Sequence, residues 1–185
     1  MAVFMLTNKP FKVKIRKTEE RNMKVINKQY NSRMCIICGM DNEYGIKAPF
    51  YNMEDNSVAT LFTYDKRHQS YPGRVHGGMI TAMLDELGFR AYWVYEPQIL
   101  AVTTSLETKY RKPVPYGVPL KGRGIVTMSN SHFVKSHAEI LDMDGNVLAD
   151  ADLKYIKLPT DKITNADYHE EMCYLINDGV TDIDF

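Results

Sequence analysis

The chain has 185 residues, and its 23 basic and 23 acidic side chains give a formal net charge of zero. This length suffices for one domain with a sizeable core, and the balanced charge excludes an overall attraction to nucleic acid or to an anionic membrane. The start of the chain lacks a basic leader followed by an apolar run, and no apolar stretch approaches membrane-spanning length. We therefore expect a cytoplasmic protein with neither nucleic-acid nor membrane partners.

The three cysteines, Cys35, Cys38 and Cys173, do not make a disulfide framework, because their number is odd and no secretion signal precedes them. Cys35 and Cys38 form a single Cys-x-x-Cys. A tetrahedral zinc site needs two more ligands, and no second Cys-x-x-Cys or His-x-x-x-His follows. The pattern favours a structural turn, and we expect no metal. A distant ligand is the alternative that the sequence leaves open.

The part of the chain before residue 76 contains a predicted arm, a predicted strand and a predicted loop. Residues 1–34 are rich in Lys, Arg, Asn and Glu, which is typical of an N-terminal arm. Residues 57–64 alternate apolar and polar side chains and predict a strand. Residues 65–75 are polar and contain Pro72-Gly73, which indicates a loop.

A long helix is predicted to begin at residues 76–78 and to end before Pro97. Its apolar side chains recur on one face, which we expect to cover the chain's own sheet: Ile80, Leu84, Leu87, Ala91 and Val94. Asp85 lies away from this stripe, beside Gly78, Ala82 and Gly88, whose small size permits close approach of another surface. We expect the Asp85 face to meet a partner and a ligand.

Four strand patterns follow the helix, at residues 99–110, 118–129, 132–143 and 147–158, and Asp144-Gly145 predicts a hairpin turn. In the predicted strand at residues 99–110, four side chains lie on one face: Leu100, Val102, Leu106 and Tyr110. The order predicts an α+β domain over residues 35–158, with one long central helix wrapped by an antiparallel sheet of about five to six strands. Residues 159–185 form a C-terminal tail with a short helix.

The helix start carries the strongest indication of chemistry. Gly77 and Gly78 leave backbone N–H groups free at the positive end of the helix dipole, where a developing oxyanion can be held. Asp85 supplies a base or a nucleophile. Gly77 and Asp85 are separated by about 12 Å along a helix, so one substrate carbonyl cannot meet both in one chain. Two antiparallel helices in a dimer would bring Asp85 of one subunit to Gly77 of the other.

This order of elements resembles the hot-dog fold, and the motifs resemble those of phenylacetate-type acyl-CoA thioesterases, also called PaaI-like. The resemblance covers about residues 35–158. It rests on Val-His-Gly-Gly at residues 75–78 with an aspartate nine residues after the histidine, on Thr103-Thr104, on Tyr-x-x-Pro at residues 110–113, on the Asp-Gly hairpin, and on Cys-x-x-Cys-Gly-x-x-Asn-x-x-Gly-Ile at residues 35–46.

The resemblance implies that the Gly77 N–H polarises a thioester carbonyl and that Asp85 from the other subunit acts as general base or nucleophile. It implies that His76 holds the loop and that Thr103 assists the attacking water. Relatives carry an amide side chain six residues before the histidine. Ser70 stands there in this sequence with Gln69 beside it, and which of the two, if either, takes that role stays open.

Each of these interpretations has a simpler competitor. Asp85 could be an ordinary exposed helical carboxylate, and Thr103 and Thr104 suit any strand. Arg111 and Lys112, near Lys109, could bind the phosphates of coenzyme A or could be a charged strand edge.

The function expected from the resemblance is hydrolysis of an acyl-CoA thioester to a carboxylic acid and free CoA. No cofactor is needed, since CoA is part of the substrate, and the expected assembly is a homodimer or a homotetramer built of two dimers. Two alternatives are a hot-dog enoyl-CoA hydratase or dehydratase and a non-catalytic acyl-CoA binding module. The sequence does not identify the acyl group.

Overall fold

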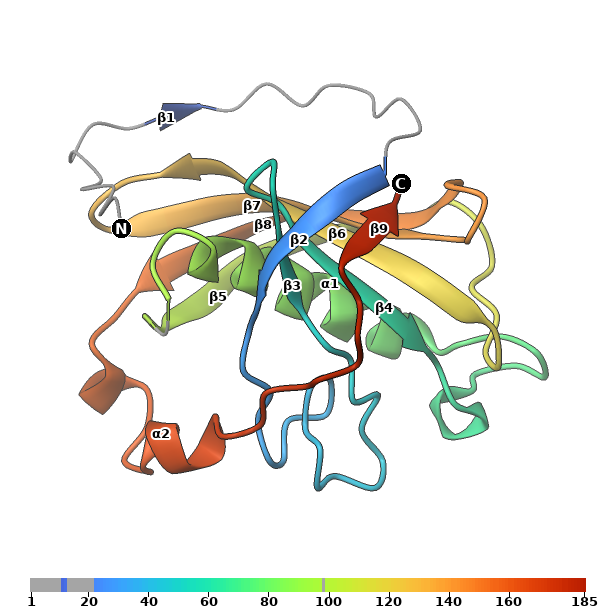
Figure 1. The fold of residues 1–185 in the computed structure, drawn as a ribbon, viewed down its shortest axis with the longest axis horizontal. Helices are drawn as coiled ribbons and strands as arrows, with labels where there is room; N and C mark the ends of the chain where they lie inside the picture. Colours follow the sequence, from blue (N-terminus) through green and yellow to red (C-terminus); the bar gives the residue numbers. More distant parts are fainter. Residues whose placement is uncertain (1–10, 13–21, 98) are drawn as a thin grey trace.

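The computed structural model describes residues 11–12, 22–97 and 99–185. One long helix, α1 (Gly77–Trp93), lies in the hollow of a curved antiparallel sheet (Figure 1). The strands along the sheet are, in spatial order, β5 (Ala101–Tyr110), β8 (Val147–Lys157), β7 (Phe133–Leu141), β6 (Pro119–Ser129), β4 (Val58–Thr63), β3 (Tyr51–Met53), β2 (Asn22–Lys28) and β9 (Asp182–Asp184), while β1 (Phe11–Lys12) pairs with β6. This arrangement confirms the predicted helix wrapped by an antiparallel sheet.

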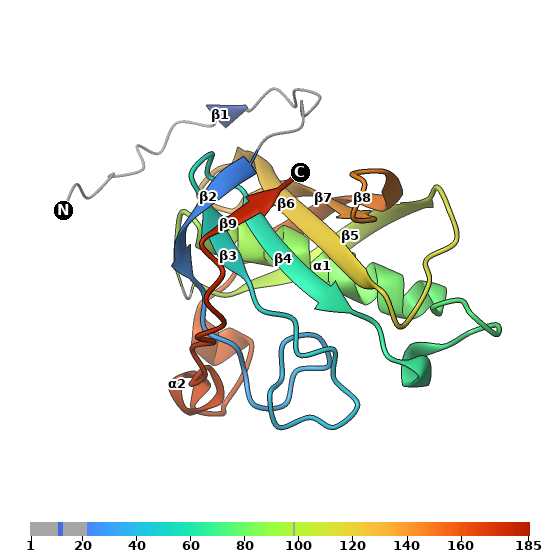
Figure 2. The same cartoon turned by 45° about the vertical axis from the view of Figure 1, so that its right-hand side comes forward.

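The expected count of five to six strands is wrong, because the described residues contain nine. The strand predicted before the helix and the four predicted after it are present as β4, β5, β6, β7 and β8. The additional strands come from short or polar segments without a clear apolar alternation. β2 and β9 lie outside residues 35–158 and pair with each other at one edge of the sheet (Figure 2). Most of the expected arm, residues 1–10 and 13–21, lies outside the described residues.

The C-terminal segment also contacts the loop that follows β2. The short helix α2 (Tyr168–Glu171) follows a 3-10 turn at Thr160–Lys162. The Arg33 N–H donates to the carbonyl of Glu171, and Asn31 forms an isolated bridge with Tyr174. These contacts hold the β2–β3 loop and the C-terminal segment together.

Helix α1 packs on the sheet through the predicted stripe. Ile80 is 4% exposed, and Leu84, Leu87 and Ala91 are fully buried. A side chain at Gly124 of β6 would collide with the Leu87 carbonyl, so glycine at that position permits the close approach of helix and sheet. Within the described residues no helix combines the length and the apolar character that a membrane span requires.

The structure differs from the prediction at two positions, one on β5 and one on α1, in the direction that the residue faces. A bulge between Thr103 and Ser105 changes the alternation of β5, so Val102 is 39% exposed instead of sharing the inner face with Leu106. Gly88 is buried against the chain's own sheet, since a side chain there would meet the hydroxyl of Tyr155 at 2.5 Å. The smallness of Gly88 therefore serves the packing of α1 on β8.

Candidate active site

The start of α1 is organised by His76, its N-cap residue. The His76 backbone is extended, and its Nδ1 accepts a hydrogen bond of 2.9 Å from the Gly78 N–H. The His76 N–H donates to the carbonyl of His68 at 2.8 Å, which fixes the preceding loop. No described residue accepts a hydrogen bond from the Gly77 N–H. Of the two glycines, Gly77 therefore has the N–H that is available to a ligand.

Asp85 lies on α1 opposite strand β5. The Thr103 hydroxyl donates to Asp85 Oδ1 at 2.9 Å, and the Tyr155 hydroxyl donates to the Asp85 carbonyl at 2.9 Å. The carboxyl group is partly buried, and this burial raises its pKa above the usual range for aspartate. The face of α1 that carries Asp85 thus contacts the chain's own β5 and β8, where the sequence had suggested a free surface.

Strand β5 also contacts the start of α1. The Tyr110 hydroxyl donates to the Gly77 carbonyl at 3.1 Å and lies 2.8 Å from Thr81 Oγ1. A side chain at Gly77 would lie 3.2 Å from the Tyr110 hydroxyl. β5 therefore holds both halves of the candidate site, Asp85 through Thr103 and Gly77 through Tyr110. The Tyr-x-x-Pro motif indicated Tyr110, but Thr81 gave no signal in the sequence.

β5 is also an edge strand of the sheet, since it pairs only with β8 among the described residues. Its other edge has backbone groups free to pair with another strand. Asp85 and Gly77 consequently lie beneath the edge of the sheet that a second chain could approach.

Gln69 and Ser70 lie in the exposed loop that leads into α1. Gln69 Oε1 accepts a hydrogen bond of 2.9 Å from the Tyr116 hydroxyl, and the Ser70 N–H donates to the Arg74 carbonyl. The loop is anchored by His68, a buried residue whose Nε2 lies 2.8 Å from the Tyr44 carbonyl. Both candidates for the amide position are therefore near the start of α1, and Gln69 is already engaged with Tyr116.

The remaining candidates for substrate binding are spread along β5 and the loop after it. The exposed Thr104 donates to the Lys154 carbonyl. Arg111 makes two hydrogen bonds to Asp150, at 2.5 and 3.2 Å, which use its guanidinium. Lys112 lines a surface cavity of about 490 Å³ together with Arg74, and this cavity is otherwise lined mainly by apolar side chains and prolines. Lys112 is thus better placed than Arg111 to receive a ligand.

The sequence model of the Thioesterase superfamily matches residues 72–149, from the loop before α1 to strand β8. The fold is the hot-dog fold of that superfamily. The resemblance to hot-dog thioesterases is thereby confirmed, and the matched residues include Gly77, Asp85 and Thr103. No curated protein sequence matches the chain.

Several solved structures superpose on this chain. A thioesterase superfamily protein does so with a TM-score of 0.62 at 24% identity, covering 66% of this chain and 63% of that chain. The E. coli PaaI protein from the phenylacetic acid degradation operon does so with a TM-score of 0.56 at 15% identity, covering 62% and 81%. Zebra fish thioesterase superfamily member 2 gives a TM-score of 0.51 at 16% identity, covering 55% and 75%. These identities bear on the fold alone.

One group of side chains in the described part of the hot-dog domain has donor atoms spaced as metal ligands are. It consists of Cys35 and Cys38 from the β2–β3 loop and Glu86 from α1. Asp85 and Glu86 are neighbours in sequence, but their side chains contact different elements: Asp85 contacts β5, and Glu86 contacts the loop.

Proposed function

We propose that the protein is an acyl-CoA thioesterase, which hydrolyses a thioester to a carboxylic acid and free CoA. The observation that carries this proposal is the placement of Asp85. Its carboxyl group is partly buried and held at one oxygen by Thr103, and it lies on the helix whose first residue, Gly77, offers a free N–H. A base and an oxyanion donor are the two groups that this hydrolysis requires.

In the proposed reaction the Asp85 carboxylate accepts a proton from water as the water oxygen attacks the thioester carbonyl carbon. The Gly77 N–H donates a hydrogen bond to the oxygen that becomes negative in the tetrahedral intermediate. Collapse of this intermediate breaks the C–S bond, and the leaving CoA sulfur takes up the proton that Asp85 accepted, which restores the carboxylate. Thr103 occupies Asp85 Oδ1, which leaves the second carboxylate oxygen for the water.

The proposed site is shared between two subunits. Gly77 and Asp85 are both on α1, separated by about 12 Å at 1.5 Å per residue, which is too far for one carbonyl and its attacking water. The open edge of β5 lies beside both residues. Two copies that meet along this edge about a two-fold axis would place their helices antiparallel, with Asp85 of each near Gly77 of the other.

Lys112 is our candidate for binding the CoA phosphates. It lines the cavity beside the loop that leads into α1, together with Arg74. One carboxylate, Asp142, also lines this cavity, so the two cations leave a net positive charge beside an apolar wall, which suits a ligand with a charged nucleotide and an apolar acyl chain.

The test is hydrolysis of a panel of short, medium, long and aromatic acyl-CoA substrates by wild-type protein and by Asp85→Asn. We expect Asp85→Asn to lower kcat/KM by about 10²-fold or more, the typical contribution of a general base. The matched control is Asp161→Asn, an exposed aspartate in the 3-10 turn after β8. A folded Asp85→Asn protein with wild-type activity would overturn the assignment, as would binding of acyl-CoA without turnover across the panel.

A further inference from the structure

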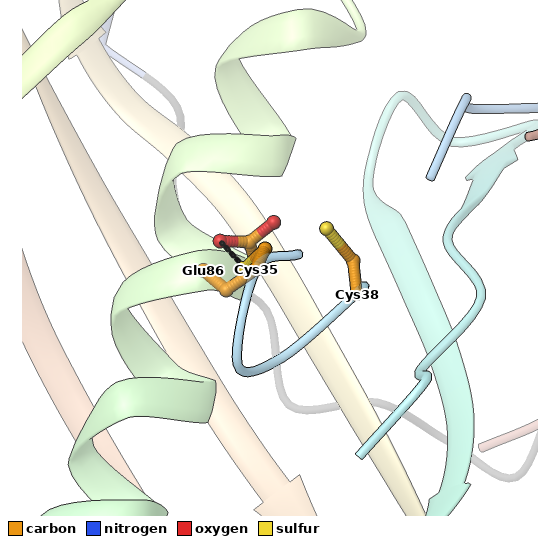
Figure 3. A group of neighbouring side chains, drawn as sticks. All are labelled: Cys35, Cys38 and Glu86. Carbon is orange, nitrogen blue, oxygen red and sulfur yellow. Dashed lines mark hydrogen bonds between the residues drawn. The ribbon is translucent and has the colours of Figure 1, made fainter. Parts of the chain in front are cut away.

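The loop between β2 and β3 brings two thiols to a carboxylate of α1. Figure 3 shows Cys35 and Cys38 of the loop next to Glu86 of the helix. Their donor atoms all lie within 4.8 Å of one another, and Cys35 Sγ is 4.0 Å from Glu86 Oε2. Thiolate and carboxylate ligands of one zinc ion lie at about 2.3 and 2.0 Å from the metal, so only a small contraction of this group is needed.

The Cys-x-x-Cys turn is built around the sulfur of its first cysteine. The Gly39 N–H donates to the Cys35 carbonyl at 2.8 Å, which closes the turn. The Ile37 N–H donates to Cys35 Sγ at 3.3 Å, and the Cys35 N–H donates to Ser32 Oγ at 3.0 Å. A backbone N–H directed at the sulfur stabilises a negative charge there, which favours the thiolate that metals bind.

Arg90 fixes the orientation of the Glu86 and Cys38 side chains. Its side chain is fully buried between the rings of Phe50 and Trp93. Arg90 Nε donates to Glu86 Oε1 at 2.8 Å, and Nη2 donates to Cys38 Sγ at 3.1 Å. Because Arg90 holds Oε1, the second carboxylate oxygen of Glu86 faces the sulfurs. Outer-shell donors of this kind orient the ligands of metal sites.

With both thiols protonated, Glu86 and Arg90 balance each other, whereas with both thiols ionised the group is neutral only with a divalent cation. Two thiolates and one carboxylate carry three negative charges, of which Arg90 compensates one. A buried excess charge is costly unless it is paired or coordinates a metal. A dication would make the cluster neutral.

We propose that Cys35, Cys38 and Glu86 bind one zinc ion, with water as the fourth ligand. Binding replaces the two thiol protons, which are released to solvent, with two Zn–S bonds. No electron transfer is involved. The ion would fasten the β2–β3 loop to α1, and its role is structural. The expectation of no metal rested on the missing ligands beside the Cys-x-x-Cys, and Glu86 supplies one of them from a distant part of the chain.

The experiment titrates the reduced, metal-free full chain with Zn²⁺ against a competing chromophoric chelator, and with Co²⁺ as a spectroscopic probe. We expect one ion per chain, thiolate-to-cobalt charge-transfer absorption with the visible bands of a tetrahedral site, and a higher Tm with zinc. Cys35→Ser, Cys38→Ser and Glu86→Gln should each weaken zinc binding at least 10-fold, the lower limit for loss of even an outer-shell partner. The matched control is Cys173→Ser, which replaces an exposed thiol outside the cluster.

A second measurement does not depend on whether the variants fold. In wild-type protein, zinc should protect Cys35 and Cys38 from alkylation and leave Cys173 reactive, as mass spectrometry of the peptides would show. The proposal is overturned if zinc binds at less than one ion per chain, if Cys35→Ser retains wild-type affinity, or if Cys173 is the protected thiol. A chain that binds no zinc when reduced and forms a Cys35–Cys38 disulfide on mild oxidation would overturn it as well.

Discussion

At the scale of single residues, Gly77 allows a test of the oxyanion donor alone. It is the first residue of α1, where proline is well tolerated because that N–H has no partner within the helix. The preceding His76 is extended, which is the conformation that proline requires of its neighbour. We expect Gly77→Pro to remove the donor while keeping the fold, and to lower kcat by about 10²- to 10³-fold.

Gly77→Ala is the matched control, because it adds a side-chain carbon at the same place and keeps the N–H. That carbon would lie 3.2 Å from the Tyr110 hydroxyl, a tight contact that a small shift relieves. Steady-state kinetics should therefore show a much smaller loss for Gly77→Ala than for Gly77→Pro. Equal losses in the two variants would mean that the position matters for shape and that its N–H does not hold the oxyanion.

The burial of Arg90 could not be predicted from the residue types in the sequence. An arginine in an amphipathic helix normally lies on the solvent face, and no sequence pattern around it indicated otherwise. In the structure it can be buried because Glu86 compensates its charge and three further groups accept its hydrogen bonds: Cys38, the Tyr30 carbonyl and Gln29. These partners come from α1 and from the chain around the β2–β3 loop, so their meeting depends on the tertiary fold.

At the scale of elements, the stability of α1 depends on its cap. His76 Nδ1 accepts the Gly78 N–H, as asparagine or aspartate oxygens do at most helix starts. We expect His76→Ala to lower the free energy of unfolding by about 0.5–2 kcal/mol and His76→Asn to restore most of it. Urea unfolding followed by circular dichroism measures both. An alanine variant as stable as wild type would show that the cap contributes nothing and that the loop contacts alone fix the helix start.

The elements that could be predicted are those with a long periodic pattern. α1 and the strands from β4 to β8 were all visible in the spacing of apolar residues, and the Asp-Gly hairpin followed from its turn chemistry. β3 and β9 are three residues each, too short to show a period. The bulge in β5 was also hidden, because an extra residue at Thr104 changes which side chains face inward without changing composition.

The candidate site was predictable to a similar degree. Gly77, Gly78 and Asp85 lie in one helix. The helix dipole at its start indicates an oxyanion donor, and the aspartate indicates a base or a nucleophile. The family resemblance, rather than the spacing, pointed to Thr103 as a site residue, and its hydrogen bond to Asp85, which joins α1 to an edge strand, was found only in the structure. Glu86 was missed as a possible ligand since only the fold brings it to the cysteines.

At the scale of the whole molecule, the stability of the sheet should depend on pH through His137. Hydrogen bonding to Glu139 and to Asp152 raises the pKa of His137 from 6.5 to about 9. Since the folded pKa is raised, the stabilisation is complete below pH 6.5 and is lost as the pH rises through 9. The shift corresponds to at most about 3 kcal/mol, and we expect roughly 1 kcal/mol because Asp152 is 60% exposed.

Comparison of wild type with His137→Gln in urea at pH 6 and at pH 9.5 measures this contribution. The difference in unfolding free energy should be largest at pH 6 and should shrink at pH 9.5. His132→Gln, an exposed histidine in the β6–β7 turn, is the control. A difference that grew with pH would contradict the raised pKa.

The shared site makes a prediction for mixed dimers that no single variant can test. A dimer of Asp85→Asn with Gly77→Pro has one site with both defects and one site with neither, if Asp85 of one subunit serves Gly77 of the other. Random reassortment of equal amounts of the two variants makes about half of the dimers mixed, and each mixed dimer has one intact site out of two. Activity should therefore recover to about a quarter of the wild-type value, although each variant alone is nearly inactive. Co-refolding the two variants and assaying acyl-CoA hydrolysis measures this recovery. If each chain instead combined its own Gly77 and Asp85, every site would keep one defect and the mixture would stay as inactive as its parents.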